Sequence, residues 1–250
     1  MPTNIYTESG WLNIPAVRSL GCWLNVIIGP RQVGKTYGVC KDLLDRGRPF
    51  IFMRRTTAEM RAICGDPDLD PWIKQDAEGY NVRMQKIPGA DTYAIGDINP
   101  DTGKIENRRG MGISLSTVAS VRGFSGDKFT DLVLDEFIPE EYVVVRSSMG
   151  DAFVNALKTI SGNREILGKQ PLTVWLLANA NSIQSPILKS LNLLDDLDEL
   201  IRTGSEYKIT TNNVFLSLPK SRKVTDRLKE TPLMRQINGT AAYGMMVENE

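Results

Sequence analysis

The sequence predicts an α/β fold with a mostly parallel central sheet, because short apolar runs alternate with amphipathic helical segments. The apolar runs have the length of strands buried on both faces, which is typical of a parallel sheet covered by helices. They span residues 22–28, 49–53, 113–117, 131–134 and 173–178. Helical patterns follow several of them, and begin at Lys35, near Thr56, at Asp151 and at Ile187. This alternation predicts βαβ units.

Two regions depart from the alternation. Residues 80–109 contain two short alternating runs around Pro88-Gly89, which predicts a β-hairpin insertion. After about Arg202 the chain changes to short strands and loops. We therefore predict a main domain over residues 1–202 and a small C-terminal appendage, a linker or lid, over 203–250. The appendage carries a basic cluster, which we interpret mainly as solvated surface: Lys220, Arg222, Lys223, Arg227 and Lys229.

The composition excludes several functional classes. Thirty basic residues balance thirty acidic residues, which argues against a general nucleic-acid coat but not against local basic loops. The absence of His excludes His-based triads and His metal sites. Three Cys at non-metal spacing indicate reduced thiols of a cytosolic protein. No apolar run approaches the length of a membrane span. The N-terminus lacks a charged-then-apolar leader, so we expect no secretion.

Residues 29–36 match the phosphate-loop pattern G-x-x-x-x-G-K-[ST] in full. The match lies between a buried strand and a helix, which is the context that supports it. Its glycines let backbone N–H groups turn onto phosphates, Lys35 would reach the β- and γ-phosphates, and Thr36 would bind Mg²⁺. Arg31 could act in cis on the transferring phosphoryl group. The predicted ATP-binding set comprises Gly29, Pro30, Arg31, Gln32, Val33, Gly34, Lys35, Thr36 and Tyr37.

Asp135 and Glu136 come directly after the apolar run over residues 131–134, which we predict to be a strand. An Asp at this position of a P-loop protein holds Mg²⁺, and an adjacent Glu can orient and deprotonate the attacking water. An Asp-Glu pair at a strand end is common by itself and gains its meaning from the phosphate loop upstream. The Glu favours the ATPase branch with an additional strand and a catalytic glutamate. The N-K-x-D base reader of a GTPase does not occur in these 250 residues.

Five further residues and one segment are candidates by their place in the pattern. Asn179 follows the strand over residues 173–178 and could sense the γ-phosphate, although a turn-forming Asn is equally consistent. Arg54 and Arg55 end the second strand and are predicted near the nucleotide. Arg122 and Arg164 precede later strands and could act on the site of a neighbouring subunit, whereas a single Arg is usually solvated surface. The segment 11–20 could supply adenine contacts.

These residues resemble the DNA-packaging ATPases of tailed bacteriophages. The Arg-bearing phosphate loop is similar to that of terminase large subunits. The resemblance is closer to the DNA-encapsidation protein of small podophages with protein-primed genomes. It is carried by Met53-Arg54-Arg55, by the run from Leu134 to Ile138, by Asn163-Arg164-Glu165, by Asn179-Ala180 and by Asn238-Gly239-Thr240 with Tyr243-Gly244.

The resemblance implies a homo-oligomeric ring, usually a pentamer, on the portal vertex of a prohead in the host cytoplasm. There ATP hydrolysis drives double-stranded DNA inward, and a packaging RNA joins the motor in some relatives. The resemblance favours Arg164 as the arginine finger that acts on the site of a neighbouring subunit, whereas terminase-like patterns favour Arg122. Family members continue into a nuclease-like C-terminal domain, which we do not find in these 250 residues.

Three alternatives remain open at the level of sequence. The chain could be a helicase or AAA-type remodeller of the same ATPase branch, which strand separation would support. It could be an ATP-dependent assembly scaffold with little turnover. A P-loop small-molecule kinase is less favoured because Glu136 follows the Mg²⁺-binding Asp.

Overall fold

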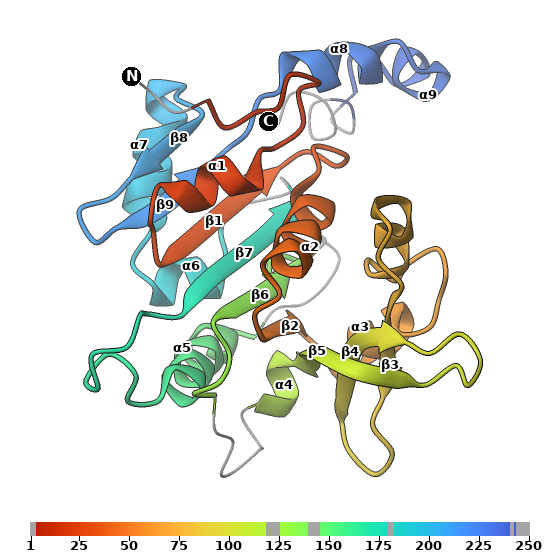
Figure 1. Ribbon diagram of the computed structural model, residues 1–250. Coiled ribbons are helices and arrows are strands. Elements are labelled where there is room, and N and C mark those ends of the chain that lie inside the picture. Colours follow the sequence, from red (N-terminus) through yellow and green to blue (C-terminus); the bar gives the residue numbers. More distant parts are fainter. Residues whose placement is uncertain (1–3, 119–125, 140–145, 180–182, 241–242, 244–250) are drawn as a thin grey trace.

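The computed structural model describes residues 4–118, 126–139, 146–179, 183–240 and 243. Within this part of the chain, nine strands form one sheet in the order β3-β4-β5-β2-β6-β7-β1-β9-β8 (Figure 1). The strands are β1 (Leu24–Gly29), β2 (Phe50–Arg54), β3 (Val82–Lys86), β4 (Thr92–Ile98), β5 (Ile105–Ser114), β6 (Asp131–Asp135), β7 (Thr173–Asn179), β8 (Tyr207–Ile209) and β9 (Val214–Ser217).

Six central strands pair with one another in parallel, in the order β5, β2, β6, β7, β1 and β9. The pairs β3–β4, β4–β5 and β8–β9 are antiparallel. This confirms the predicted α/β fold with a mostly parallel sheet. The helices are α1 (Ile14–Ser19), α2 (Lys35–Arg46), α3 (Thr57–Ile63), the 3₁₀ helix η1 (Ile73–Glu78), α4 (Leu115–Val118), α5 (Ser148–Ser161), α6 (Pro186–Ser190), α7 (Leu194–Thr203), α8 (Arg222–Lys229) and α9 (Pro232–Gln236).

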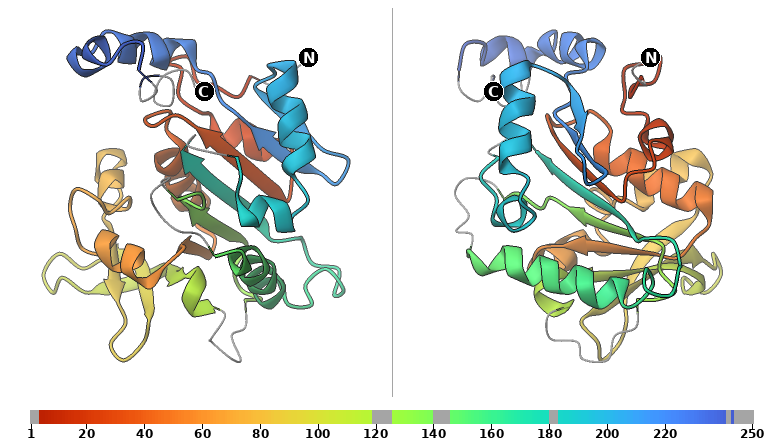
Figure 2. Two further views of the ribbon diagram at one scale, coloured as in Figure 1. Left: turned by 180° about the vertical axis from the view of Figure 1, so that it is seen from behind. Right: turned by 90° about the vertical axis from the view of Figure 1, so that its left-hand side faces the viewer.

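Helices cover both faces of the central strands (Figure 2). Helices α1 and α2 lie on one face, and α5, α6 and α7 lie on the other. Strand β6 shows how the sequence serves both layers: Leu132 and Leu134 belong to the core under α5, whereas Val133 belongs to the core under α2. All five residues of β6 are buried, so its continuous apolar run is explained by burial on two sides.

Local signals set the ends of the two helices nearest the candidate site. Helix α2 begins after Gly34, which has a φ of 87°, and stops at Gly47, which has a φ of 62°. Both angles lie in the left-handed region that glycine adopts without strain. Helix α3 begins with the predicted capping box, in which the Thr56 side chain accepts from the Glu59 N–H and the Glu59 carboxylate accepts from the Thr56 N–H.

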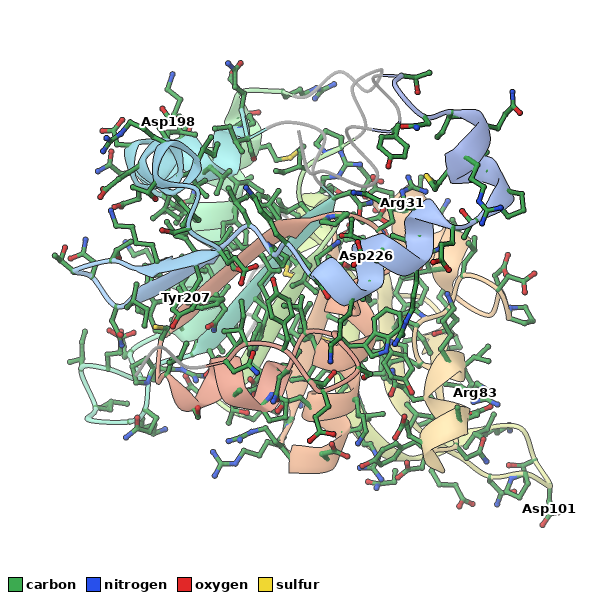
Figure 3. All side chains as sticks on the ribbon, turned by 90° about the horizontal axis from the view of Figure 1, so that it is seen from above. Arg31, Arg83, Asp101, Asp198, Tyr207 and Asp226 are labelled. Carbon is green, nitrogen blue, oxygen red and sulfur yellow. The ribbon has the colours of Figure 1, made fainter. Side chains whose placement is uncertain are left out.

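The predicted insertion is present as the antiparallel hairpin β3–β4, and β5 joins it to β2. The connection before it packs on α2, because Gln75 Nε2 donates to the Tyr37 carbonyl at 3.2 Å and the Tyr37 hydroxyl donates to Glu78 at 2.6 Å. Figure 3 shows the insertion, marked by Asp101, and α7, marked by Asp198, at opposite ends of the molecule. The predicted strand over 113–117 ends earlier, since β5 stops at Ser114 and α4 follows.

The predicted boundary at Arg202 is wrong. Strand β9 pairs in parallel with β1, in the register Leu24↔Val214, and therefore extends the central sheet. A parallel pairing between such distant segments gives no local signal in the sequence. The sequence therefore predicted β8 and β9 to lie outside the main domain. Helices α8 and α9 follow β9 at the edge where β1 ends (Figure 1), and Val224 of α8 packs into the core under α2.

The single helix predicted over residues 187–200 is also wrong. The segment is split into α6 and α7, and between them Asn192 adopts a left-handed φ of 56°. Asn tolerates this conformation better than most residues, which allows a sharp turn there. In the described part of the chain, no helix is both long and apolar enough to span a membrane.

Candidate nucleotide-binding site

The predicted phosphate loop connects the buried strand β1 to α2, at the carboxyl edge of the sheet. Gln32 and Gly34 have φ angles of 66° and 87°, so the loop turns sharply before α2 begins. Arg31 is exposed on the same loop. This arrangement of strand, tight loop and helix N-terminus is the geometry that binds phosphate through backbone N–H groups.

Lys35 is folded back into its own loop and is only 7% exposed. Its Nζ donates to the carbonyls of Gly29 and Pro30 at 2.8 and 2.7 Å, and to Asn179 Oδ1 at 3.3 Å. Burial lowers the pKa of Lys35 to about 8, although the nearby Asp135 carboxylate opposes the shift. The three donors of the ammonium thus have protein acceptors that phosphate oxygens could replace.

Asp135 and Thr36 form the second part of the site. The Thr36 hydroxyl donates to Asp135 Oδ1 at 2.9 Å. Asp135 is 2% exposed, and burial raises the pKa of its carboxyl group while the Arg54 guanidinium partly offsets that effect. Asp135 Oδ2 lies 2.9 Å from Arg54 Nη2, yet it accepts no hydrogen bond of good geometry within the described residues.

This donor set fits Mg²⁺. A hydroxyl and a carboxylate with a buried, incompletely satisfied oxygen are hard ligands of the kind that Mg²⁺ prefers. Among the described residues, no group of three or more Cys, Asp and Glu side chains could hold a metal alone. A Mg²⁺ ion at this place would be held by one carboxylate, one hydroxyl, water and substrate phosphates.

Glu136 follows Asp135 and has a half-exposed side chain, with an exposed fraction of 51%. Its backbone adopts a φ of 53°, which is uncommon for a residue other than Gly. Arg54 Nη1 lies 2.5 Å from Glu136 Oε2. The two predicted carboxylates are therefore brought together with the phosphate loop.

Arg54 ends β2 and Arg55 follows it, and their side chains contact different partners. Burial disfavours the charge of Arg54, but Asp135 and Glu136 outweigh it and raise the pKa of Arg54 above its usual value. Arg55 instead pairs with Glu59 of α3. The structure thus brings Arg54, but not the Arg55 guanidinium, to the carboxylates of the predicted site.

Asn179 lies at the site by sheet register, because Gly29 and Asn179 are paired in the β1–β7 ladder. Its Oδ1 accepts from Lys35, so it contacts the residue that would hold the phosphates. Its role as a sensor stays a prediction.

The Arg164 guanidinium is buried and donates hydrogen bonds within its own chain. Arg164 is 4% exposed, and its Nη2 donates to the carbonyls of Phe129 and Gly126 at 2.6 and 3.2 Å. These carbonyls precede β6, so Arg164 lies at the opposite end of that strand from Asp135. The strand separates them by roughly 15 Å. Arg122 lies outside the described residues.

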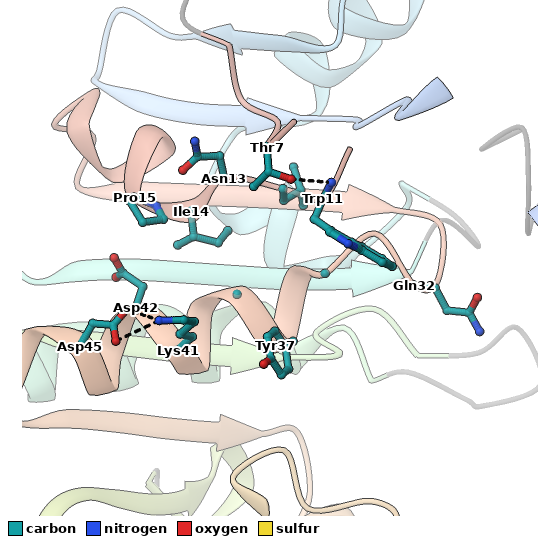
Figure 4. Close-up of a pocket in the computed structure, with 13 residues that line it drawn as sticks. Thr7, Trp11, Asn13, Ile14, Pro15, Gln32, Tyr37, Lys41, Asp42 and Asp45 are labelled. Carbon is teal, nitrogen blue, oxygen red and sulfur yellow. Dashed lines mark hydrogen bonds and ion pairs between the residues drawn. The ribbon is translucent and has the colours of Figure 1, made fainter. Parts of the chain in front are cut away.

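A cavity of about 650 Å³ adjoins the phosphate loop, between the N-terminal segment and α2 (Figure 4). It is lined by Thr7, Trp11, Leu12, Asn13, Ile14, Pro15, Gln32, Gly34, Tyr37, Gly38, Lys41, Asp42 and Asp45. Leu12 N donates to the Val33 carbonyl at 3.1 Å, which fixes the N-terminal segment to the loop. The Trp11 ring packs over Gly34, since a Cβ there would lie 3.6 Å from Trp11 Cε3.

A second segment, which the sequence analysis missed, covers the start of the loop. A Cβ on Gly29 would lie 2.6 Å from Pro219 Cγ, so the chain after β9 packs directly on this glycine. The Ser221 hydroxyl donates to the Gly10 carbonyl at 2.5 Å and ties this segment to the N-terminal one. The requirement for Gly at position 29 was visible in the sequence, but its neighbour 190 positions away was not.

Comparisons with known proteins show the family and the fold of the chain. A family model described as Podovirus DNA encapsidation protein (Gp16) matches residues 7–250. The chain is 27% identical over 237 residues to a "DNA packaging protein" of Bacillus phage B103, which covers 91% of this chain and 64% of that protein. This chain therefore spans less than two thirds of the relative's length.

Two solved structures share the fold. The N-terminal domain of the DNA packaging ATPase from bacteriophage phi29 superposes with a TM-score of 0.61 at 22% identity, over 85% of this chain and 97% of that one. The Phi-28 gp11 DNA packaging motor gives a TM-score of 0.65 at 15% identity, over 97% of this chain and 69% of that one. At such identities the structures support the fold, while the family model covers almost the whole sequence. The chain belongs to the Podovirus DNA encapsidation protein (Gp16) family.

Proposed function

We propose that this chain is an ATP-hydrolysing motor that drives double-stranded viral DNA into a preformed prohead. One observation carries the proposal: the Thr36 hydroxyl, the Asp135 carboxylate and the Lys35 ammonium meet at one sheet edge, with Glu136 beside them. Membership of a DNA-encapsidation family supports DNA packaging as the process that this hydrolysis drives. The chain also shares its fold with the domain of a DNA packaging ATPase, so the fold is compatible with this function.

In the proposed reaction, Lys35 exchanges its loop carbonyls for β- and γ-phosphate oxygens. Thr36 and Asp135 hold Mg²⁺, which supplies positive charge to offset that of the phosphates. Glu136 orients a water and accepts its proton as the water oxygen bonds to the γ-phosphorus and the bond to ADP breaks. Asn179 would register the loss of the γ-phosphate through its contact with Lys35.

The cavity beside α2 is our proposed site for the adenine base. Trp11 and Tyr37 offer aromatic surface at the end of the cavity nearest the phosphate loop, and Gln32 offers an amide there (Figure 4). Large planar side chains on a pocket of this size suit a planar base. Lys41 pairs with Asp45 at the other end, at 2.8 Å.

The assembly belongs to the same proposal. We propose a homo-oligomeric ring, a pentamer, which docks on the portal vertex, works in the host cytoplasm and can be joined by a packaging RNA. An arginine from the neighbouring copy would complete each site. Arg164 would serve there only after leaving the carbonyls of Phe129 and Gly126, and Arg122 is the other candidate.

The test is steady-state ATP hydrolysis over a protein-concentration series, with double-stranded DNA, single-stranded DNA or no DNA. The parent and Glu136→Gln are compared, with Glu165→Gln as the control because Glu165 is an exposed carboxylate on the loop before β7. We expect the parent's specific activity to rise with concentration and with double-stranded DNA. Glu136→Gln should bind ATP but lose on the order of a hundredfold or more in turnover.

Three results would contradict the proposal. Near-parental turnover by Glu136→Gln would remove this residue from catalysis. Stimulation by single-stranded DNA with strand separation would point to a helicase, and nucleotide-dependent assembly without turnover would point to a scaffold.

A further inference from the structure

Two neighbouring apolar side chains are exposed on the loop between α5 and β7. Ile166 is 85% exposed and Leu167 is 64% exposed, the two highest values among the large apolar side chains of the described residues. Single exposed apolar residues are ordinary on a protein surface, whereas contiguous ones mark contact sites. The pair therefore indicates a partner that covers it.

The loop that carries this pair is held in one conformation. Arg164 Nη2 donates to the Gly126 and Phe129 carbonyls, which fastens the loop to the segment before β6. Within the loop, Leu167 N donates to the Asn163 carbonyl at 2.9 Å. A preformed loop loses little conformational entropy on binding, so the apolar pair is presented in a conformation ready to dock.

The surroundings of the pair are mostly basic. Lys158, in the last turn of α5, and Lys169 are exposed on either side of it in the chain, and Glu165 is the one acidic residue between them. We call Ile166 and Leu167, together with the two lysines, the knob. A partner that fits the knob offers an apolar recess with acidic groups at its rim.

A pocket of this complementary character lies between the start of α5 and helices α6 and α7, with a volume of about 750 Å³. Its apolar lining includes Pro186 and Leu194. Asp151 and Asp198 line it as exposed residues, and Lys189 is the one basic residue of its lining. We call it the acidic pocket. Its volume is in the range of pockets that enclose small molecules, so two aliphatic side chains fit into it.

The knob and the acidic pocket lie toward opposite ends of α5. This helix spans Ser148–Ser161, so its ends are about 20 Å apart. The right-hand view of Figure 2 shows the loop after α5 at one end of the helix, and α6 and α7 toward the other end. The knob of a copy therefore does not reach the acidic pocket of the same copy.

From this complementarity we propose that the knob of one copy docks into the acidic pocket of the next copy and joins copies of this chain head to tail. The inference rests on the homo-oligomeric ring of the proposed function. A contact between two different surfaces of one chain is heterologous, and it generates a closed ring when the rotation from copy to copy closes. The aliphatic side chains anchor the contact, and the opposite charges around them set its orientation.

A nucleic-acid backbone fits these surfaces less well than a second copy. Phosphates would meet the lysines of the knob, but they would leave Ile166 and Leu167 uncovered and would be repelled by Asp151 and Asp198. A second copy covers the apolar pair and the acidic pocket at once.

Sedimentation velocity over a protein-concentration series, with and without a non-hydrolysable ATP analogue, tests the apolar anchor. Ile166→Ser combined with Leu167→Ser should raise the concentration for half-maximal association on the order of tenfold or more. Both residues are exposed, so thermal unfolding should not change. Leu233→Ser is the matched control and should associate like the parent, because Leu233 is 59% exposed on α9, away from both surfaces (Figure 1).

Charge reversal tests the pairing of the two surfaces. One chain carries Lys158→Glu with Lys169→Glu, so its knob and its pocket are both acidic. A second chain carries Asp151→Lys with Asp198→Lys, so both of its surfaces are basic. Each chain alone should associate on the order of tenfold more weakly than the parent, because like charges face each other at the contact. An equimolar mixture should recover association, since each knob then meets a pocket of opposite charge.

Three outcomes overturn the inference: a parent that stays monomeric throughout the concentration series, parental association by the double serine variant, or no recovery in the charge-reversed mixture. The motor function is judged separately, by turnover. Association that depends on the knob and recovers in the mixture, without ATP turnover by the parent, would contradict the motor function and still support this contact between copies.

Together, the two measurements distinguish a heterologous contact from a symmetric one. If the knob packed against the same loop of a second copy, reversing the charges of the pocket would leave association unchanged. That result, too, would overturn the inference.

Discussion

The Thr36 hydroxyl donates a hydrogen bond to Asp135 Oδ1 at 2.9 Å and joins the first turn of α2 to the end of β6. The two residues are 99 positions apart in sequence, and no other pair links the two predicted motifs so directly among the described residues. Both oxygens are ligands suited to Mg²⁺. The bond thus marks the place where the cation would enter between loop and strand.

Removing the Thr36 hydroxyl should therefore weaken the binding of Mg²⁺ more than the binding of nucleotide. We expect Thr36→Ala to raise the Mg²⁺ concentration for half-maximal turnover at least about tenfold, because one of few protein ligands is lost. Thr36→Ser keeps the hydroxyl and should stay close to the parent. Identical Mg²⁺ dependence of the alanine and serine variants would contradict the metal role of Thr36. A magnesium titration of ATP turnover measures it.

The affinity for ATP should fall above about pH 8. In the ligand-free chain burial lowers the pKa of Lys35 to about 8 from its usual 10.5, so the ammonium loses its proton above that pH. ATP phosphates favour the charged form and raise this pKa on binding, so binding takes up a proton above about pH 8. Affinity should be level at lower pH and then fall by up to about tenfold per pH unit.

Equilibrium binding of a fluorescent ATP analogue from about pH 6.5 to about pH 9.5 tests this, since the range brackets the shifted pKa. Lys35→Arg is the control, because a guanidinium stays charged over the whole range. An equal slope for the parent and Lys35→Arg would assign the pH dependence to another group. Lys35→Ala should lose both binding and turnover.

Trp11 should contribute to the affinity for the base rather than to hydrolysis. Trp11→Ala should raise KM for ATP on the order of tenfold with kcat nearly unchanged, since the ring contacts the cavity and not the phosphates. Trp11→Phe should retain most of the affinity. Leu69→Ala is the control, because Leu69 is a comparably exposed apolar residue outside the cavity, at 51% against 41% for Trp11. A lower kcat with an unchanged KM for Trp11→Ala would refute the assignment.

Arg164 should matter first for stability. Arg164→Ala removes a donor from the buried carbonyls of Phe129 and Gly126, of which the Gly126 carbonyl keeps the Phe129 N–H. This loss should cost about 1–3 kcal/mol in the free energy of unfolding. Denaturant unfolding measures this cost. Mixing Arg164→Ala with Lys35→Ala chains tests the trans role, because the second chain could lend its arginine to an intact site in the first.

We expect no recovery of turnover in that mixture while the guanidinium remains buried. Recovery would show that Arg164 leaves its carbonyls and serves a neighbouring copy. The same mixture with Arg122→Ala tests the other candidate. Recovery with Arg122→Ala alone would assign the arginine finger to Arg122.

The sequence by itself determined the tight loop between β1 and α2, the strand that ends in Asp135-Glu136 and the α/β class. These features are local: the loop needs its glycines, Gly29 and Gly34, at a fixed short spacing, and a strand buried on both faces needs a continuous apolar run. The capping box of Thr56 and Glu59 and the hairpin β3–β4 were predictable for the same reason.

Only the tertiary structure decided which distant segments complete the site. The parallel pairing of β9 with β1 places Pro219 on Gly29, and the N-terminal segment places Trp11 on Gly34. The side chain of Arg54 turns to Glu136 while that of Arg55 turns to Glu59, although the two arginines are adjacent and alike in sequence. Side chains of successive strand residues point to opposite faces, so the choice between those partners depends on which elements pack on each face.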